Sequence, residues 1–307
     1  MNVILQIIRR LVQVGVILGL FALIYINLYA HYRAARALED LEGFQGQVLM
    51  AIDRYCEGFD DPQPWLDSIT GTLWSLKIGV VEFTDPVAAA EAIAASRSLY
   101  VPLLMSILIP VLGTLVLGRV FCSWICPGTL FFEIGSLLRR LLRLAEIPPG
   151  QIRFSLKNKY ILLIVGLTIA TITGLPLFAN IYPPAVISRV LHAWVFGTAL
   201  KTLLIVLGLM LLVEVLVSPR WWCRTMCPGG ALYGLLGAKR LLRVKVNTDT
   251  CTRCQKCHPA CPMGLKPEEQ SAGIECDNCG VCLRHCPEKS LAFGLQLPDR
   301  PRKEQGT

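Results

Sequence analysis

The chain has 307 residues, of which 53% are hydrophobic and 17% are charged, and its formal net charge is +8. Its mean hydropathy of +0.52 is too high for an ordinary soluble domain and indicates a membrane protein. The sequence contains neither a dinucleotide-binding glycine motif nor a nucleic-acid-binding motif, so we expect no nucleic-acid partner.

Four apolar segments are long enough to cross the hydrocarbon core of a bilayer. The first follows Arg9 and Arg10, as a signal peptide would, but its length favours a retained membrane anchor. We therefore predict a membrane all-α domain over residues 1–245, with four transmembrane helices. The expected spans are residues 11–30, 99–118, 160–180 and 196–217.

The distribution of charge predicts the topology, because Lys and Arg mark the cytoplasmic side of a membrane protein. Residues 119–160 contain seven Lys or Arg and two acidic residues. Residues 38–98 contain eleven of the 22 acidic residues and only three basic ones. We expect a multi-pass protein of the bacterial inner (cytoplasmic) membrane with cytoplasmic N- and C-termini. Residues 38–98 would be a periplasmic insertion, in which the Ala-rich residues 87–95 form a helix.

A cysteine motif, C-x₃-C-P, occurs twice at a separation of 101 residues. The copies are FCSWICPG at residues 121–128 and WCRTMCPG at residues 222–229. Each copy follows an apolar segment and leads into an amphipathic stretch that ends in arginines, residues 129–143 and 230–243. We expect each stretch to form a helix that lies in the membrane interface. The shared orientation predicts two parallel repeats, related by an axis along the membrane normal.

The four cysteines of this repeat have three interpretations. In the first, they meet at the cytoplasmic side of the membrane and bind a third cluster or another metal. In the second, they cycle between dithiol and disulfide. In the third, they are unmetallated thiols in tight turns. The sequence leaves these alternatives open for Cys122, Cys126, Cys223 and Cys227.

Residues 246–295 contain two identical runs, C-x₂-C-x₂-C-x₃-C-P, and precede a polar tail at residues 296–307. Bacterial-type ferredoxins hold two [4Fe–4S] clusters with such runs, and the fourth cysteine of each run binds the other cluster. Three other interpretations of these cysteines fit less well. Disulfides suit small secreted domains, and a zinc site needs fewer cysteines. A haem attachment at Cys254–His258 would use cysteines that already belong to the first run. We predict Cys251, Cys254, Cys257 and Cys286 for cluster 1, and Cys276, Cys279, Cys282 and Cys261 for cluster 2.

These motifs together resemble the NapH and MauN type of ferredoxin-like membrane protein, over roughly residues 10–295. The segments Gly71–Trp74 and Asp85–Pro86 also resemble the outer loop of that group. The resemblance implies a quinol dehydrogenase subunit that uses the lipid-dissolved quinone pool. Its electrons would pass to a partner ferredoxin or cytochrome subunit of a periplasmic respiratory or amine-oxidising system.

Quinol oxidation releases protons, so an ionisable group is expected where quinol binds. Glu214 in the fourth span and His192 on the predicted outer side are the catalytic candidates. The alternative function is a redox assembly or maturation factor that reduces a metal or a disulfide in another protein.

Overall fold

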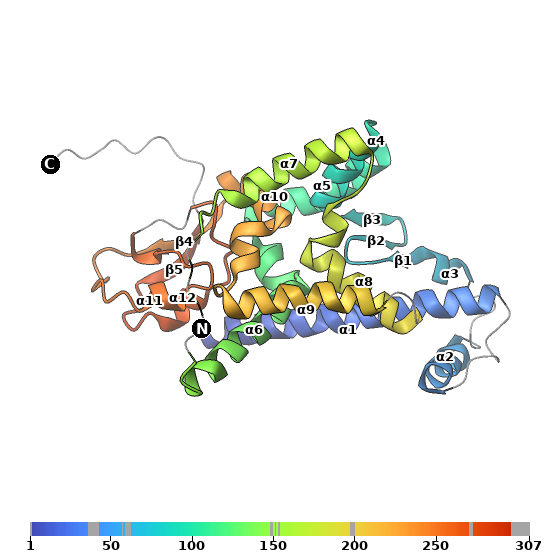
Figure 1. The fold of residues 1–307 in the computed structure, drawn as a ribbon, viewed down its shortest axis with the longest axis horizontal. Helices are drawn as coiled ribbons and strands as arrows, with labels where there is room; N and C mark the ends of the chain where they lie inside the picture. The colour runs from blue at the N-terminus through green and yellow to red at the C-terminus, as the bar shows by residue number, and fades with distance from the viewer. Residues whose placement is uncertain are drawn as a thin grey trace. The chain divides into compact units, whose positions relative to one another are not determined.

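The computed structural model describes residues 2–35, 43–56, 58, 63–147, 150, 152, 154–196, 200–269 and 273–295, so the predicted polar tail lies outside the described residues. This part of the chain is mostly helical (Figure 1). The helices are α1 Asn2–Ala34, α2 Gly43–Cys56, α3 Gln63–Ser68, α4 Pro86–Ser96, α5 Val101–Leu117, α6 Pro127–Leu144, α7 Asn158–Thr173, α8 Pro183–Phe196, α9 Leu200–Leu216, α10 Pro228–Leu236, α11 Cys257–Ala260 and α12 Val281–His285. The strands are β1 Ile69–Gly71, β2 Ser75–Ile78, β3 Val81–Thr84, β4 Leu242–Val246 and β5 Leu291–Leu295.

The chain folds into two compact units, neither of which is one continuous segment. Unit 1 combines residues 1–13, 109–165 and 213–307, and unit 2 combines residues 14–108 and 166–212. Helices α1, α5, α7 and α9 each contribute residues to both units. The division therefore differs from the predicted boundary at residue 245, which separates only the end of the chain.

Among the described helices, only α1 is both long and apolar enough to cross a membrane by itself. Helices α5, α7 and α9 coincide with the other three predicted spans but have 17, 16 and 17 residues. A hydrocarbon core of about 30 Å requires roughly 20 residues, so these helices are short for that task. Residues 197–199 of the fourth predicted span lie outside the described residues. Four transmembrane helices in two repeats therefore remain a proposal.

Unit 2 contains a three-stranded antiparallel sheet, in the order β1-β2-β3, that the expectation of an all-α domain missed. Lys77 on β2 lies opposite Glu82 on β3. Gly71 ends β1 with a φ of 112°, and an added Cβ there would lie 2.1 Å from the carbonyl oxygen of Ser75. Strands of three or four residues are too short to show the alternating pattern that identifies strands in a sequence.

The Ala-rich segment of unit 2 forms helix α4, as predicted. Asp85 caps it by accepting the backbone N–H of Val87 at 2.7 Å, and its second carboxylate oxygen accepts the hydroxyl of Tyr182 at 3.0 Å. Glu91 is 2% exposed and accepts the backbone N–H of Phe178 at 2.6 Å. These two carboxylates are therefore held by neutral donors.

Unit 1 contains the cysteine-rich C-terminal part, in which β4 pairs antiparallel with β5. The predicted amphipathic helix over residues 129–143 is confirmed as α6. The second predicted stretch, residues 230–243, is wrong as one helix, because α10 ends at Leu236 and β4 starts at Leu242. Val244 and Val246 favour a strand, and pairing with β5 gives their backbone groups partners. The C-terminal fold thus begins a few residues before the predicted residue 246.

Candidate metal centre

One pocket in unit 1 is lined by four cysteines that come from both runs. They are Cys251, Cys254, Cys257 and Cys286, the set predicted for cluster 1. Arg253 and Gln255 adopt positive φ angles of 53° and 58°, which turn the chain between successive cysteines. Cys254 is exposed, so this set of cysteines reaches the protein surface.

A second pocket is lined by the complementary set, Cys261, Cys276, Cys279 and Cys282, which is predicted for cluster 2. The loop between these cysteines bends at Asn278 and Gly280, where φ is 53° and 68°. Cys279 and Cys282 are buried, in contrast to the exposed cysteine of the first pocket. The structure therefore brings each predicted set of four together, and the role of these cysteines as ligands remains a proposal.

The donors of both pockets fit an iron–sulfur cluster better than a single metal ion. A tetrahedral zinc site draws its thiolates to about 2.3 Å from one point. In the described part of the chain, no three His, Cys, Asp or Glu residues are placed to hold one metal ion. A cubane is wider than an ion and takes four thiolates at its corners. Burial raises the pKa of Cys276 to about 11 and of Cys282 to about 12, so metal binding would have to displace the thiol protons.

The two C-x₃-C-P loops have the same local structure. Phe121–Ile125 and Trp222–Met226 each form a π-helical turn, and each following cysteine is extended before a proline starts the next helix. Cys126 N–H bonds to the carbonyl of Phe121 at 2.8 Å, and Cys227 N–H bonds to that of Trp222 at 2.9 Å. This agreement supports an internal repeat at the level of the loops.

The thiols of the two loops lie close enough to interact electrostatically. Burial raises the pKa of Cys126, and the neighbouring thiols of Cys122 and Cys227 raise it further. Burial also raises the pKa of Cys223, and Cys227 and Cys126 again add to the effect. Both motifs belong to unit 1, and what their four cysteines bind stays a prediction.

A buried ion-pair network joins the first C-x₃-C-P loop to the second cysteine run. Arg119, three residues before Cys122, donates to the carboxylate of Glu275 at 2.8 Å. Lys159 pairs with the same carboxylate, and the hydroxyl of Tyr160 donates to its other oxygen at 2.7 Å. Burial opposes ionisation of Glu275, but Arg119 and Lys159 more than offset it and lower the pKa of this carboxyl.

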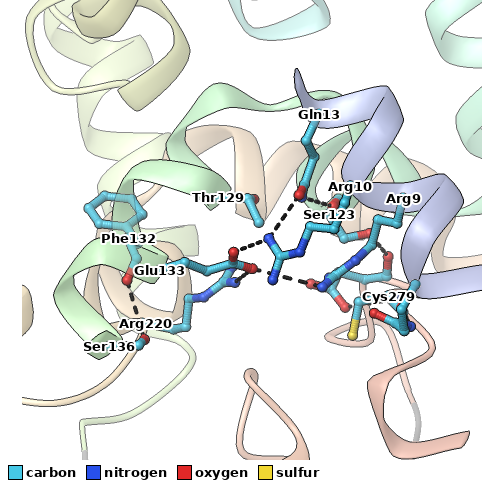
Figure 2. Close-up of polar contacts among 12 residues, drawn as sticks. Arg9, Arg10, Gln13, Ser123, Thr129, Phe132, Glu133, Ser136, Arg220 and Cys279 are labelled. Carbon is cyan, nitrogen blue, oxygen red and sulfur yellow. Dashed lines mark hydrogen bonds and ion pairs between the residues drawn. The ribbon is translucent and has the colours of Figure 1, made fainter. Parts of the chain in front are cut away.

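A second ion-pair network surrounds the single carboxylate of Glu133 on α6 (Figure 2). Arg220, three residues before Cys223, lies 3.2 Å from it, and Arg9 of α1 lies at 3.8 Å. Arg10 also pairs with Glu133. Figure 2 shows Arg9 extending beside Cys279 of the second run. One carboxylate thus faces three guanidinium groups, and positive charge remains in excess.

Polar contacts also hold the second cysteine run against the first loop. Ser123 donates to the carbonyl of Asp277 at 2.6 Å, and Trp124 donates to the carbonyl of Asn278 at 3.3 Å. Gln6 of α1 donates to the carbonyl of Cys279 at 2.9 Å. Helix α1, the first C-x₃-C-P loop and the second run therefore form one hydrogen-bonded assembly within unit 1.

The basic residues of this assembly are not among the site residues predicted from the sequence. The equal offset of Arg119 and Arg220 from the first cysteine of each motif was visible in the 101-residue repeat and is the signal that would have found them. Nothing local marks Lys159 or Glu275, because their roles depend on contacts across more than one hundred residues.

The two catalytic candidates lie in different units. Glu214 is 1% exposed near the end of α9 in unit 1, where one carboxylate oxygen accepts the backbone N–H of Trp222 at 3.3 Å. The other oxygen has no hydrogen-bond partner among the described residues. His192 lies on α8 in unit 2, its ring stacked on Phe196 with 5.7 Å between centroids. Glu214 interacts electrostatically with Cys223 of the second C-x₃-C-P loop.

Comparison with protein families identifies the two C-x₃-C-P segments. A family model described as a 4Fe-4S binding domain matches residues 99–145 and 198–248. Each match contains one copy of the motif, and the eight cysteines of the C-terminal runs lie outside both. No solved structure matches the chain.

Comparison with curated proteins finds relatives along most of the chain. The ferredoxin-type protein NapH of Haemophilus influenzae is 32% identical over 73% of this chain and 79% of its own length. NapH of Escherichia coli is 32% identical over 70% of this chain and 75% of its length. The methylamine utilization ferredoxin-type protein MauN of Paracoccus denitrificans is 31% identical over 60% and 63%. The protein therefore belongs to the NapH and MauN family of ferredoxin-type iron–sulfur electron-transfer proteins.

Proposed function

We propose that this protein is a membrane-bound iron–sulfur electron carrier that oxidises quinol. Its redox partner would belong to a periplasmic respiratory or amine-oxidising system, and the methylamine utilization in the name of the MauN relatives supports the second of these. The observation that carries the proposal is the arrangement of the eight C-terminal cysteines into two four-cysteine pockets. Clusters bound there supply one-electron redox chemistry, and the cysteines of both runs hold them.

Exposed apolar side chains support a location in the membrane. Helices α5, α7 and α9 carry many large hydrophobic residues that the other described residues leave exposed, to 65% at Met105, 65% at Ile164 and 63% at Ile205. An apolar surface of this extent is unfavourable in water and is expected where lipid surrounds the protein. These three short helices would then cross the bilayer together with α1, and local thinning would match the bilayer to their length.

Glu214 is the residue best placed to take a proton from quinol. Quinol gives up two protons with its electrons, so a nearby carboxylate has a direct use. The unpartnered carboxylate oxygen of Glu214 lies in unit 1, the unit that also contains both four-cysteine pockets. An ionisable group inside an apolar helix is costly, which makes it a functional candidate. His192 is the second candidate, and its Nε2 also has no partner among the described residues.

Reduction by a quinol analogue tests the proposal. The full chain, purified anaerobically in detergent, would be mixed with a reduced water-soluble quinol while EPR follows the reduction of its clusters. We expect reduction with the wild-type protein and at least about tenfold slower reduction with Glu214→Gln. Glu146→Gln, an exposed carboxylate outside the cysteine region, is the matched control and should behave as wild type. Clusters that dithionite reduces but quinol never does would remove the quinol dehydrogenase function.

Protease protection tests the topology. Inside-out vesicles should lose the cysteine-rich C-terminal part to added protease, whereas right-side-out vesicles should retain it. The opposite pattern would place the clusters outside and would reverse the predicted orientation of every span.

A further inference from the structure

Three buried polar side chains lie on one face of the first turns of α1, within unit 1. Gln6, Arg9 and Gln13 follow one another at spacings of three and four residues, so they share a face of the helix. Each is at most 8% exposed, although the residues between them are mostly apolar. Burial of such groups is unfavourable unless they have polar partners, and Gln13 has one in the carbonyl of Ser123, at 2.8 Å.

The same end of α1 lies against the loop that lines the second four-cysteine pocket. Gln6 donates to the carbonyl of Cys279 at 2.9 Å. Leu5 packs beside the next residue of the loop, because a Cβ added at Gly280 would lie 2.8 Å from its Cδ2 atom. Cys279 and Gly280 both line the pocket, so the start of α1 directly contacts the wall of this pocket.

Arg9 is the charged member of this face of α1. Its guanidinium lies 3.8 Å from the carboxylate of Glu133. It also extends beside Cys279 (Figure 2), with which it interacts electrostatically. Its Nε is buried and has no hydrogen-bond partner among the described residues. Arg9 therefore provides the second pocket with both a positive charge and a hydrogen-bond donor.

The carboxylates near Arg9 do not neutralise it fully. Glu133 is shared with Arg10 and with Arg220, which lies closer to it at 3.2 Å. Asp277 lines the second pocket, but its carboxylate accepts a backbone N–H of the cysteine loop at 3.3 Å and forms no ion pair with Arg9 in the described part of the chain. A buried cation favours an anionic partner, and a cluster bound by the four cysteines of this pocket is an anion.

We propose that Arg9 tunes the iron–sulfur cluster of the second pocket, because its positive charge stabilises the reduced cluster and raises the reduction potential. The inference rests on the proposed function, in which the four cysteines of this pocket bind such a cluster. Reduction adds one electron to a cluster that is already an anion, so a buried cation beside it favours the reduced state. The sulfur atoms of the cluster also supply acceptors for the unpartnered Nε of Arg9.

The first pocket has different surroundings. A carboxylate oxygen of Glu268 lies 3.2 Å from the sulfur of Cys257, and Glu288 also lines this pocket. The basic residue of its lining, Arg253, is exposed to water. Water and salt screen an exposed charge much more than a buried one. We therefore expect Arg9 to act on the cluster of the second pocket alone.

The reduction potentials of the two clusters test the inference. The full chain, purified anaerobically in detergent, would be titrated with dithionite and redox mediators while EPR follows each cluster signal. Arg9→Met should lower the potential of one signal and leave the other unchanged, and Arg9→Lys should restore most of the loss. Cys254→Ser replaces an exposed cysteine of the first pocket, so it should alter or remove the signal that Arg9→Met leaves unchanged.

The neighbouring arginine of α1 is the matched control. Arg10 pairs with the same carboxylate of Glu133, but its side chain is 46% exposed. Arg10→Met should therefore leave both potentials unchanged. If Arg9→Met fails to fold, Arg9→Gln keeps a hydrogen-bond donor without the charge and should also lower the potential of the one signal.

The outcomes separate this inference from the proposed function. Unchanged potentials in Arg9→Met, an equal shift in Arg10→Met, or a shift of the signal that Cys254→Ser alters would overturn the role of Arg9 and leave both clusters in place. Purified protein that has lost residues 1–13, as measured by mass spectrometry, would also overturn it. Clusters that quinol never reduces would overturn the proposed function but not the effect of Arg9, since dithionite is the reductant in the titration. Protein without iron would overturn both.

Discussion

Unit 1 buries six basic side chains and contains twelve of the thirteen cysteines, whereas the charged residues buried in the described part of unit 2 are Asp85 and Glu91. The carboxylates of unit 2 are held by backbone N–H groups and a tyrosine hydroxyl. In unit 1, the carboxylates of Glu133 and Glu275 each face more than one cation. Buried positive charge therefore coincides with the cysteines, as expected if that unit holds anionic clusters and the other does not.

Glu275→Leu should have the largest effect on stability, because it leaves Arg119 and Lys159 buried without their carboxylate. We expect the free energy of unfolding to fall by about 3–5 kcal/mol. Chemical denaturation in detergent, followed by circular dichroism, measures it. Glu275→Gln keeps the side-chain volume and an oxygen acceptor and should cost less. Equal stability of Glu275→Leu and wild type would show that the cations of unit 1 do not depend on this carboxylate.

Asp85→Ala should have the next largest effect and should be confined to unit 2. It removes the cap of α4 and leaves the hydroxyl of Tyr182 without this acceptor, which together cost about 2–3 kcal/mol. Iron content per chain, measured with the denaturation midpoint, should stay at the wild-type value. A loss of iron on this substitution would break the comparison, because unit 2 would then be needed to retain the clusters.

Short sequence motifs predicted the cysteine sets, the likeness of the two C-x₃-C-P loops and helix α4. The C-x₂-C-x₂-C-x₃-C-P runs predicted which cysteines meet, and the 101-residue repeat predicted that the two C-x₃-C-P loops are alike and adjacent. Helix α4 follows from a run of alanines after a capping aspartate. These features were predictable because each is marked by a short motif that can be recognised in the sequence.

Long-range contacts were not predictable in this way. Gln6 bonds to the carbonyl of Cys279 across 273 residues, and Arg119 meets Glu275 across 156. Their local surroundings do not mark them as partners. The same limit applies to strand β4. The amphipathic pattern predicted a helix over residues 230–243, but Leu242–Val246 form a strand because they pair with β5.

Glu91→Gln should remove a pH dependence that belongs to unit 2. Burial raises the pKa of Glu91, so the folded protein binds this proton more tightly than the unfolded chain does. Stability is then lost as pH rises from the unfolded pKa of about 4.3 through the raised pKa of the folded protein. The wild-type melting temperature should fall across this window more than that of Glu91→Gln, and the two should converge at the acidic end. Parallel curves would show that the backbone donors already offset the cost of burial.

Lys77→Met should have the smallest effect and sharpens the contrast between the ion pairs of the two units. Lys77 and Glu82 lie opposite each other on β2 and β3, 3.8 Å apart, with side chains 46% and 49% exposed. Exposed pairs contribute at most about 1 kcal/mol, because water and salt screen them. Chemical denaturation should therefore show a small decrease in the free energy of unfolding for Lys77→Met and a large decrease for Glu275→Leu. A loss at Lys77 as large as that at Glu275 would mean that burial of charge is not what distinguishes unit 1.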